Sequence, residues 1–247
     1  MSNSSVNYLF TNYAAATIMP FTKAELEEAT QWTNKYLAEL PGLFDSSIVQ
    51  FYTTLNQRNL SGFVGEVFKH VIFGLNKNFM PNPHPDGRPD IINLNSAIEK
   101  NYFEQVCFDP VSRAPLREHL APFKYGGIEV KSSIGNTPSA GNLEIGQSRS
   151  ELITGLNYWA HHAHECTLLG IYYDYCDQTN NSPQIKGLVY CHLVESDWNK
   201  VSVGRPDRKK TSNTSLNQAG VGKLKRSLIM HSSESKYIKT FSRLGHL

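Results

Sequence analysis

The sequence predicts an α/β protein in which helices flank a central mixed β-sheet. Apolar residues recur at helical spacing through the first 75 positions, whereas short apolar segments rich in β-branched residues follow from position 90 onward. One partly helical pattern separates these segments, and this order is typical of a mixed sheet covered by helices. The 247 residues suffice for one large domain and are few for two, so we expect a single domain.

The N-terminal part, about residues 1–80, is expected to be mainly helical. Residues 22–40 begin with a threonine that can cap a helix and continue with glutamates and regularly spaced apolar residues. Pro41 and Gly42 are expected to end this helix. Two further helices are expected over residues 46–55 and 61–75.

The central part, about residues 81–198, is expected to hold the sheet. Its proline-rich beginning, residues 81–88, is predicted to be a loop, as is the glycine- and asparagine-rich segment 134–146. Strands are predicted over residues 90–94, 127–132, 167–175 and 185–194, the last two as a hairpin, with a partly helical segment over residues 148–162.

The sequence shows no recognisable targeting or membrane-spanning segment. The first basic residue is Lys23, and the apolar stretch 14–21 is too short to cross a bilayer. The four cysteines form no CxxC pair, which is typical of a reducing compartment. We therefore expect a cytoplasmic protein with no membrane partner.

The charge is distributed unevenly along the chain. Residues 199–247 hold eleven Lys and Arg against two acidic residues, a net charge of +9, and the remainder is acidic at −7. Such a basic C-terminal part is either a solvated surface or a surface for a polyanion. Its basic residues alternate with Ser, Thr, Asn, Gln and Gly, which favours nucleic acid.

Three residues form the candidate chemical centre. Side chains of a strand alternate between its faces, so Glu129 and Lys131 are expected to point the same way while Val130 packs into the core. Asp90 opens another short apolar strand. If the two strands pair, two carboxylates and an ammonium converge on one side of the sheet.

This trio suits hydrolysis of a phosphodiester. Asp90, Glu129 and the main-chain carbonyl of Val130 offer the oxygen ligands that Mg²⁺ prefers, and Mn²⁺ is expected to substitute. Lys131 is expected to orient or deprotonate the attacking water and to stabilise the transition state. The chain has no GxxxxGK[ST] motif, so no nucleotide cofactor is expected.

The sequence contains Pro89-Asp90 and, after a spacer, Glu129-Val130-Lys131. This pattern resembles the motif of the PD-(D/E)xK nucleases. The resemblance covers about residues 90–194 and implies a restriction-endonuclease-like fold, dependence on Mg²⁺ and cleavage of DNA. The 39 positions from Asp90 to Glu129 are many for this family, and an insertion over residues 99–122 would account for them.

The motif has weaker matches elsewhere in the chain. Glu234 and Lys236 form a second ExK, in a polar stretch where no strand is predicted. Asp86 and Asp207 also follow prolines, but no apolar strand follows either of them. Asp90 is preferred because two isoleucines follow it directly.

The resemblance also implies roles for two neighbouring segments. Glu66 lies on the predicted helix before the core, where members of the class carry a glutamate that helps to bind metal. His161 and His162 precede a predicted strand and are expected near a DNA phosphate, or else as a histidine cluster that joins this segment to the core. A zinc site here would need a second ligand pair, and the sequence offers none.

Residues 204–226 are expected to form much of the DNA surface. Basic residues at both ends would bind phosphates, and the uncharged middle would read bases, because Asn and Gln can pair with adenine. A disordered basic loop is the alternative. The residues expected to contact DNA here are Arg205, Arg208, Lys209, Lys210, Asn213, Asn217, Gln218, Lys223, Lys225 and Arg226.

Three functions remain open on sequence grounds. The first is a type II restriction endonuclease that cuts double-stranded DNA at a specific site, which a two-fold dimer would do most simply. The second is a structure-selective nuclease of repair or recombination with the same chemistry. The third is a DNA-binding module without catalysis, which the intact Asp90, Glu129 and Lys131 argue against.

Overall fold

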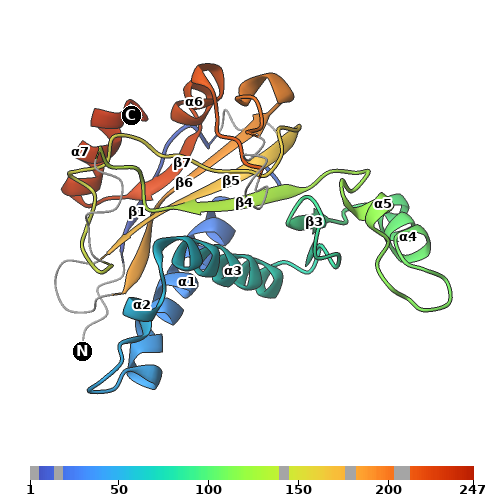
Figure 1. Ribbon diagram of the computed structural model, residues 1–247, viewed down its shortest axis with the longest axis horizontal. Coiled ribbons are helices and arrows are strands. Elements are labelled where there is room, and N and C mark those ends of the chain that lie inside the picture. Colours follow the sequence, from blue (N-terminus) through green and yellow to red (C-terminus); the bar gives the residue numbers. More distant parts are fainter. Residues whose placement is uncertain (1–5, 14–18, 139–144, 176–181, 203–211) are drawn as a thin grey trace, which may run out of the picture.

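The computed structural model describes residues 6–13, 19–138, 145–175, 182–202 and 212–247. Within these ranges a seven-stranded mixed sheet has helices on both of its faces, so the predicted α/β class is confirmed (Figure 1). In chain order the elements are β1 (Tyr8–Phe10), α1 (Lys23–Phe44), α2 (Phe51–Thr54), α3 (Gln57–Leu75), β2 (Phe79–Pro81), β3 (Ile91–Asn93), α4 (Ala97–Val106), α5 (Arg117–Leu120), β4 (Ile128–Ser133), β5 (Cys166–Tyr175), β6 (Pro183–Leu193), the 3₁₀ helix η2 (Glu195–Asp197), α6 (Gln218–Lys225), β7 (Leu228–Ser232) and α7 (Ser235–Leu244).

The strands lie in the order β1-β7-β6-β5-β4-β3-β2. Only β4 and β5 are parallel, and the other neighbours are antiparallel, including the predicted hairpin of β5 and β6. Because parallel neighbours need a long connection, residues 134–165 cross from the end of β4 to the start of β5. This crossover carries the histidine segment.

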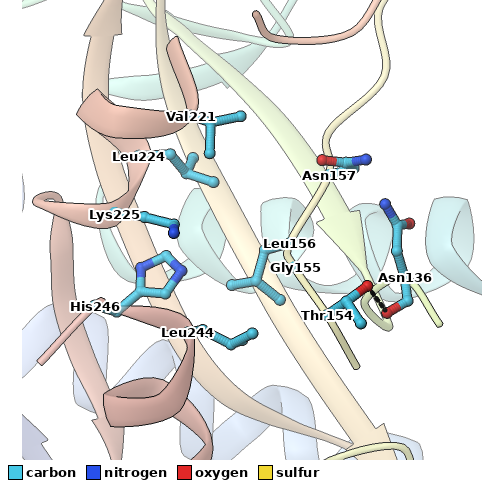
Figure 2. Close-up of a pocket in the computed structure, with 10 residues that line it drawn as sticks. All are labelled: Asn136, Thr154, Gly155, Leu156, Asn157, Val221, Leu224, Lys225, Leu244 and His246. Atoms are coloured by element: carbon cyan, nitrogen blue, oxygen red, sulfur yellow. Dashed lines mark hydrogen bonds between the residues drawn. The ribbon is translucent and has the colours of Figure 1, made fainter. Parts of the chain in front are cut away.

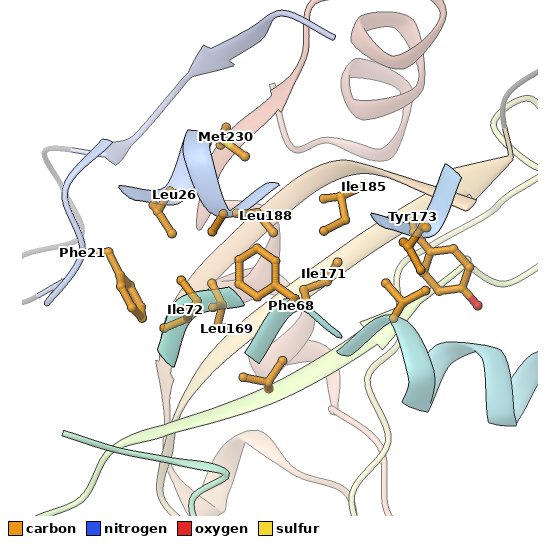
Figure 3. Packing of buried hydrophobic residues seen from close by; sticks show 14 of the residues in the cluster. Phe21, Leu26, Phe68, Ile72, Leu169, Ile171, Tyr173, Ile185, Leu188 and Met230 are labelled. Carbon is orange, nitrogen blue, oxygen red and sulfur yellow. The ribbon is translucent and has the colours of Figure 1, made fainter. Parts of the chain in front are cut away.

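The central strand β5 is buried on both faces. Every second side chain of the strand, Leu169, Ile171 and Tyr173, points to one face of the sheet. There they pack with side chains of α1 and α3 such as Leu26 and Phe68 (Figure 3). A continuous apolar run such as TLLGIYYDY is the pattern that such a doubly covered strand requires.

The opposite face of the sheet is covered from the C-terminal end of the chain. Leu168 and Tyr172 of β5 pack there against Leu224 of α6 and Phe241 of α7. Gly187 of β6 lies under Phe241, and a Cβ at this position would approach the ring to 2.4 Å. The C-terminal fifth therefore supplies core as well as surface.

Helix α1 continues beyond the end that its proline predicted. Pro41 has no N–H to donate to the carbonyl of Leu37, which would break an ordinary helix. The hydroxyl of Tyr52 donates to that carbonyl instead, at 2.6 Å, and the helix runs on to Phe44. The expected end at residues 41–42 was wrong because a partner distant in sequence satisfies the carbonyl.

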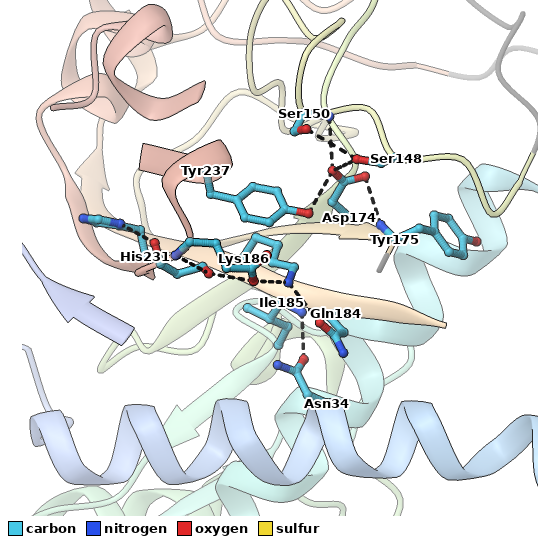
Figure 4. A network of polar contacts seen from close by, with 12 residues as sticks. Asn34, Ser148, Ser150, Asp174, Tyr175, Gln184, Ile185, Lys186, His231 and Tyr237 are labelled. Carbon is cyan, nitrogen blue, oxygen red and sulfur yellow. Dashed lines mark hydrogen bonds and ion pairs between the residues drawn. The ribbon is translucent and has the colours of Figure 1, made fainter. Parts of the chain in front are cut away.

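Residues 148–162 are not helical, contrary to expectation. The buried carboxylate of Asp174 accepts hydrogen bonds from the backbone N–H groups of Arg149 and Ser150 and from the hydroxyl of Ser148 (Figure 4). Thr154 N–H donates to the carbonyl of Asn136. These bonds to other segments replace the bonds of a helix.

Other elements differ from expectation in their bounds or were not expected at all. Helix α3 begins at Gln57, before the expected position 61, because Asn56 caps it through the N–H of Asn59. The helix expected over residues 46–55 is reduced to α2. The elements that the sequence did not predict are β1, β2, α4, α5, η2, α6, β7 and α7.

Glu234 has a structural partner that its polar surroundings did not indicate. Its Oε1 lies 2.7 Å from Nζ of Lys186, a lysine that is 1% exposed on β6. Gln184 also accepts a hydrogen bond from this ammonium, and the ring of Tyr237 lies against it with Nζ 4.7 Å from the ring centroid (Figure 4). A charge buried in this way requires its partner.

No helix in the described ranges is long and apolar enough to cross a membrane.

We predict that Glu234→Ala destabilises the fold because it leaves the buried ammonium of Lys186 without its carboxylate. The expected loss in the free energy of unfolding is about 1–3 kcal/mol, measured by urea denaturation. Glu28→Ala, at an exposed glutamate of α1, is the control and should change it by less than about 0.5 kcal/mol. Adding Lys186→Met to Glu234→Ala should restore part of the loss. Equal effects of the two alanine substitutions would contradict the assignment.

Candidate active site

The pairing of β3 with β4 brings the two halves of the predicted motif together. Ile91 is opposite Ile128 in an antiparallel register, which places Asp90 beside the strand that carries Glu129. Gly127 permits this approach, because a Cβ there would lie 2.2 Å from the carbonyl oxygen of Ile91. Its φ of +149° also favours glycine. The helices α4 and α5 fill the spacer, so the long separation in sequence is an excursion from the sheet.

The ammonium of Lys131 lies within ion-pairing distance of both the Asp90 and the Glu129 carboxylates. Nζ of Lys131 is 2.6 Å from Oε1 of Glu129 and 3.7 Å from Oδ2 of Asp90. The same Oδ2 accepts a hydrogen bond of 2.8 Å from the backbone N–H of Val130, whose side chain packs into the core as expected. One ammonium therefore lies between two carboxylates.

Helix α3 adds a second lysine that the sequence did not single out. Nζ of Lys69 lies 2.7 Å from Oε1 of Glu66 and 3.4 Å from Oδ1 of Asp90, and so links the helix to β3. The helix packs closely on β4 at Gly65, where a Cβ would lie 3.4 Å from Oγ of Ser132. The spacing of Glu66 and Lys69, three residues apart on one helix face, was the available signal.

Burial and charge shift two of the ionisable groups. Burial and the neighbouring Asp90 carboxylate raise the pKa of Glu129, whose side chain is 8% exposed, despite the favourable charge of Lys131. Burial alone would lower the pKa of Lys131, but the Glu129 and Asp90 carboxylates raise it above its ordinary value. The negative charge of the site therefore exceeds what one lysine neutralises.

The site offers only a few oxygen ligands to a hard divalent cation. No group of three or more His, Cys, Asp and Glu side chains in the described part of the chain is placed to hold a metal. Two carboxylates do meet here, and Oε2 of Glu129 is buried without a hydrogen-bond partner. The carbonyl of Val130 points to the same edge of β4 as its N–H, toward Asp90. These three oxygens suit Mg²⁺, which keeps several waters.

The site opens onto a cleft of about 1030 Å³. Basic side chains from several elements line it together with the acidic ones, so its walls can accommodate phosphate groups. The charged residues that line it are Arg58, Glu66, Lys69, Asp86, Arg88, Asp90, Arg117, Glu129 and Lys131.

Two segments that were expected to contact DNA meet at this cleft. His161 and His162, from the crossover, and Asn213 all line it. The ring of His161 donates from Nδ1 to the carbonyl of Ser212 at 2.9 Å, and Ala160 pairs with Thr214 in an antiparallel bridge. The two segments are thus joined by backbone contacts although they are fifty residues apart in sequence.

Other residues of the expected DNA surface do not line the cleft. Asn217 caps α6, with its amide oxygen accepting from two backbone N–H groups and its amide nitrogen donating to the carbonyls of Ser196 and Trp198. These bonds occupy the amide in this structure, and its base-reading role stays a prediction. Nζ of Lys223 lies 2.5 Å from the buried carboxylate of Asp197, and its role as a phosphate clamp likewise stays a prediction.

The remaining members of that set divide into two groups. Gln218, Lys225 and Arg226 are exposed on or beside α6 and are not among the residues that line the cleft. Arg205, Arg208, Lys209 and Lys210 lie outside the described residues. Ser202, which precedes them, donates its hydroxyl to Oδ1 of Asn213 at 2.6 Å, so the described chain on both sides of them meets at the cleft.

Comparisons with protein-family models, with curated proteins and with solved structures found no match to this chain.

We predict that the histidine pair beside the cleft makes stability depend on pH. Burial, together with His164, Arg88, Lys131 and His161, lowers the pKa of His162 to about 3. Burial, Arg88 and Lys131 lower that of His164 to about 4. Nε2 of His162 and Nδ1 of His164 are buried without hydrogen-bond partners, consistent with neutral rings.

The unfolded chain takes up protons on these rings near pH 6.5, and the folded protein does so only near pH 3–4. Their contribution to stability is therefore complete above pH 6.5 and is lost as the pH falls toward 4. His164→Gln should reduce the slope of unfolding free energy against pH in this window, whereas His70→Gln, at an exposed position on α3, should not. An unchanged slope for His164→Gln would contradict neutral burial of the ring.

Proposed function

We propose that the protein is a Mg²⁺-dependent endonuclease that hydrolyses phosphodiester bonds of double-stranded DNA. The observation that carries the proposal is the meeting of Asp90, Glu129 and Lys131, from two paired strands, at the wall of a cleft that is also lined by Arg58, Arg88 and Arg117. Two carboxylates and a lysine at one point suit phosphodiester hydrolysis better than acyl or hydride transfer, since neither a nucleophile elbow nor a dinucleotide motif occurs in the sequence.

The arrangement of the strands supports a restriction-endonuclease-like fold as the finer form of this proposal. Helix α3 is followed by the antiparallel set β2-β3-β4, and the parallel neighbour β5 comes after a crossover. The acidic residue precedes β3 and the Glu129-Val130-Lys131 triplet lies on β4, as the resemblance to PD-(D/E)xK nucleases implies.

In the proposed reaction Asp90, Glu129 and the Val130 carbonyl would hold the divalent cation. Glu66 lies next to this group, because Lys69 pairs with both Glu66 and Asp90. A bound Mg²⁺ would acidify a water molecule and offset negative charge on the phosphate. Lys131 orients the attacking water and offsets charge in the transition state. The water loses one proton to the solvent and its oxygen bonds to phosphorus. The bond from phosphorus to the leaving deoxyribose oxygen breaks, and that oxygen takes up a proton from the solvent.

The DNA surface in this proposal combines His161, His162 and Asn213 at the cleft with the basic run at Arg205, Arg208, Lys209 and Lys210. Cutting both strands of a symmetric site calls for two such centres, so we propose a two-fold dimer of the chain. Digestion of a sequenced plasmid, with the ends mapped, distinguishes the two nuclease candidates: discrete fragments indicate a restriction enzyme, and nicks at irregular structures indicate a repair nuclease.

We predict that Asp90→Asn, Glu129→Gln and Lys131→Met each reduce the cleavage rate by about 10²–10⁴-fold, because each removes charge or a proton acceptor from the reacting centre. The measurement is the initial rate of plasmid linearisation, with circular dichroism to verify the fold. Glu104→Gln, at an exposed glutamate of α4, is the matched control and should retain the full rate. Full activity in any of the three site variants would remove that residue from the active site.

We also predict that cleavage requires Mg²⁺ or Mn²⁺ and stops in EDTA, because the site offers only hard oxygen ligands. Ca²⁺ should support DNA binding with little cleavage, since it supplies charge without acidifying water as strongly. Calorimetry should show that Asp90→Asn weakens binding of Mn²⁺, whereas Glu104→Gln leaves it unchanged. Cleavage that persists after exhaustive chelation would rule out a metal-dependent reaction.

A further inference from the structure

A second, smaller pocket of about 250 Å³ lies between the crossover and the C-terminal helices (Figure 2). Asn136, Thr154 and Asn157 line it from the side of the crossover. Residues from α6 and from the end of α7 face them across the pocket, namely Val221, Leu224, Lys225, Leu244 and His246. None of these residues takes part in the proposed hydrolysis.

The pocket and the large cleft share part of their lining. Asn136 and Asn157 line both cavities. Asn136 follows β4 by three residues, so the shared lining begins just beyond the strand that carries Glu129 and Lys131. A polymer bound in the cleft at the reacting centre therefore passes residues that also line the pocket.

The walls of the pocket are apolar on some sides and polar on others. Leu156, Leu224 and Leu244 are buried side chains that present apolar surface, and flat aromatic faces pack well on such surface. The amides of Asn136 and Asn157 offer both donors and acceptors, the combination that reads the edge of a nucleobase. The volume is many times the roughly 30 Å³ share of one water.

His246 gives the pocket a buried polar atom that a ligand could contact. The residue is 5% exposed, and its Nδ1 has no hydrogen-bond partner. Burial and the nearby Lys225 lower the pKa of His246 to about 4 although a backbone hydrogen bond with Lys225 raises it, so the ring is neutral at pH 7 and its Nδ1 is available to a ligand. A lone anion would leave the apolar walls unused, whereas a heterocyclic base uses both kinds of wall.

We infer that this pocket binds a nucleobase that has left the stack of DNA bound in the cleft. The base lies between the leucines, and the amides of Asn136 and Asn157 contact its edge. The inference rests on the proposed DNA-binding function and adds to it a preference for DNA that carries an extrahelical base. An unpaired base enters most readily, because opening a base pair costs a few kcal/mol.

The test compares two duplexes of the same sequence in the absence of divalent metal. One is fully paired with 2-aminopurine opposite thymine, and the other carries the 2-aminopurine as a single-nucleotide bulge. Wild-type protein should bind the bulged duplex about tenfold more tightly, the effect of one good base contact. The fluorescence of the bulged probe should rise on binding, because the residues that line the pocket include no Trp, Tyr or Phe to stack on the base.

Two variants locate the effect and one controls for the substitution itself. Gly155 lines the pocket, and a Cβ there would meet nothing within 4 Å, so Gly155→Leu adds bulk at the pocket without a backbone clash. Asn157→Ala removes one amide. Both should abolish the preference for the bulge and the rise in fluorescence. Gly42→Leu, at an equally open glycine of α1, should retain both.

The outcomes separate this inference from the proposed function. Equal affinity of wild-type protein for the two duplexes, or an unchanged preference in both pocket variants, overturns the base pocket even if paired DNA is cut. A preference for the bulge without cleavage in Mg²⁺ supports the pocket and overturns the nuclease. Binding of neither duplex overturns both.

Discussion

The hydrogen bond from the backbone N–H of Val130 to the carboxylate of Asp90 joins the short strands β3 and β4, which lie next to the edge strand β2. Strand β3 has three residues and registers with β4 at one position, so few backbone bonds hold it there. The carboxylate supplies an additional bond at the point where the register ends. The same carboxylate meets Lys131 and Lys69, so the group that fixes the strand also defines the candidate active site.

The two faces of the sheet border different cavities. On one face α3 approaches β4 closely at Gly65, which brings Glu66 and Lys69 to the rim of the cleft. On the other face α6 and α7 bury their apolar sides on β5 and β6 and form one wall of the smaller pocket. The crossover from β4 to β5 contacts both cavities, because its residues Asn136 and Asn157 line each of them.

Charged residues that are buried cannot be told from exposed ones by the sequence alone. Lys186 is inside the protein with Glu234 as its partner, and Asp174 is inside with several donors from residues 148–150 and Tyr237. In sequence these residues look like solvent-exposed positions. The polar character of the C-terminal fifth therefore predicted a surface for DNA, whereas β7 and α7 within it complete the core.

Local sequence patterns predicted those elements whose form depends on neighbouring residues alone. Alternation along β4 predicted that Glu129 and Lys131 share a face, and the apolar run of β5 predicted a buried strand, because side-chain direction in a strand depends only on position. The end of helix α1 depended on Tyr52, whose hydroxyl donates a hydrogen bond to the carbonyl of Leu37. The conformation of residues 148–162 depended on Asp174, which accepts hydrogen bonds from the N–H groups of Arg149 and Ser150. Neither partner belongs to the local sequence pattern.

The candidate site divides in the same way. The sequence alone determined the two acids, the lysine and the strands that carry them, since each lies in a short motif with its own periodicity. The tertiary structure decided that Lys69 pairs with Asp90, that Asn217 and Lys223 bond to other groups of the chain, and that Asn136 and Asn157 line a second pocket. Those relations depend on distances between segments that are far apart in the chain, and such distances arise only when the sheet and its helices pack.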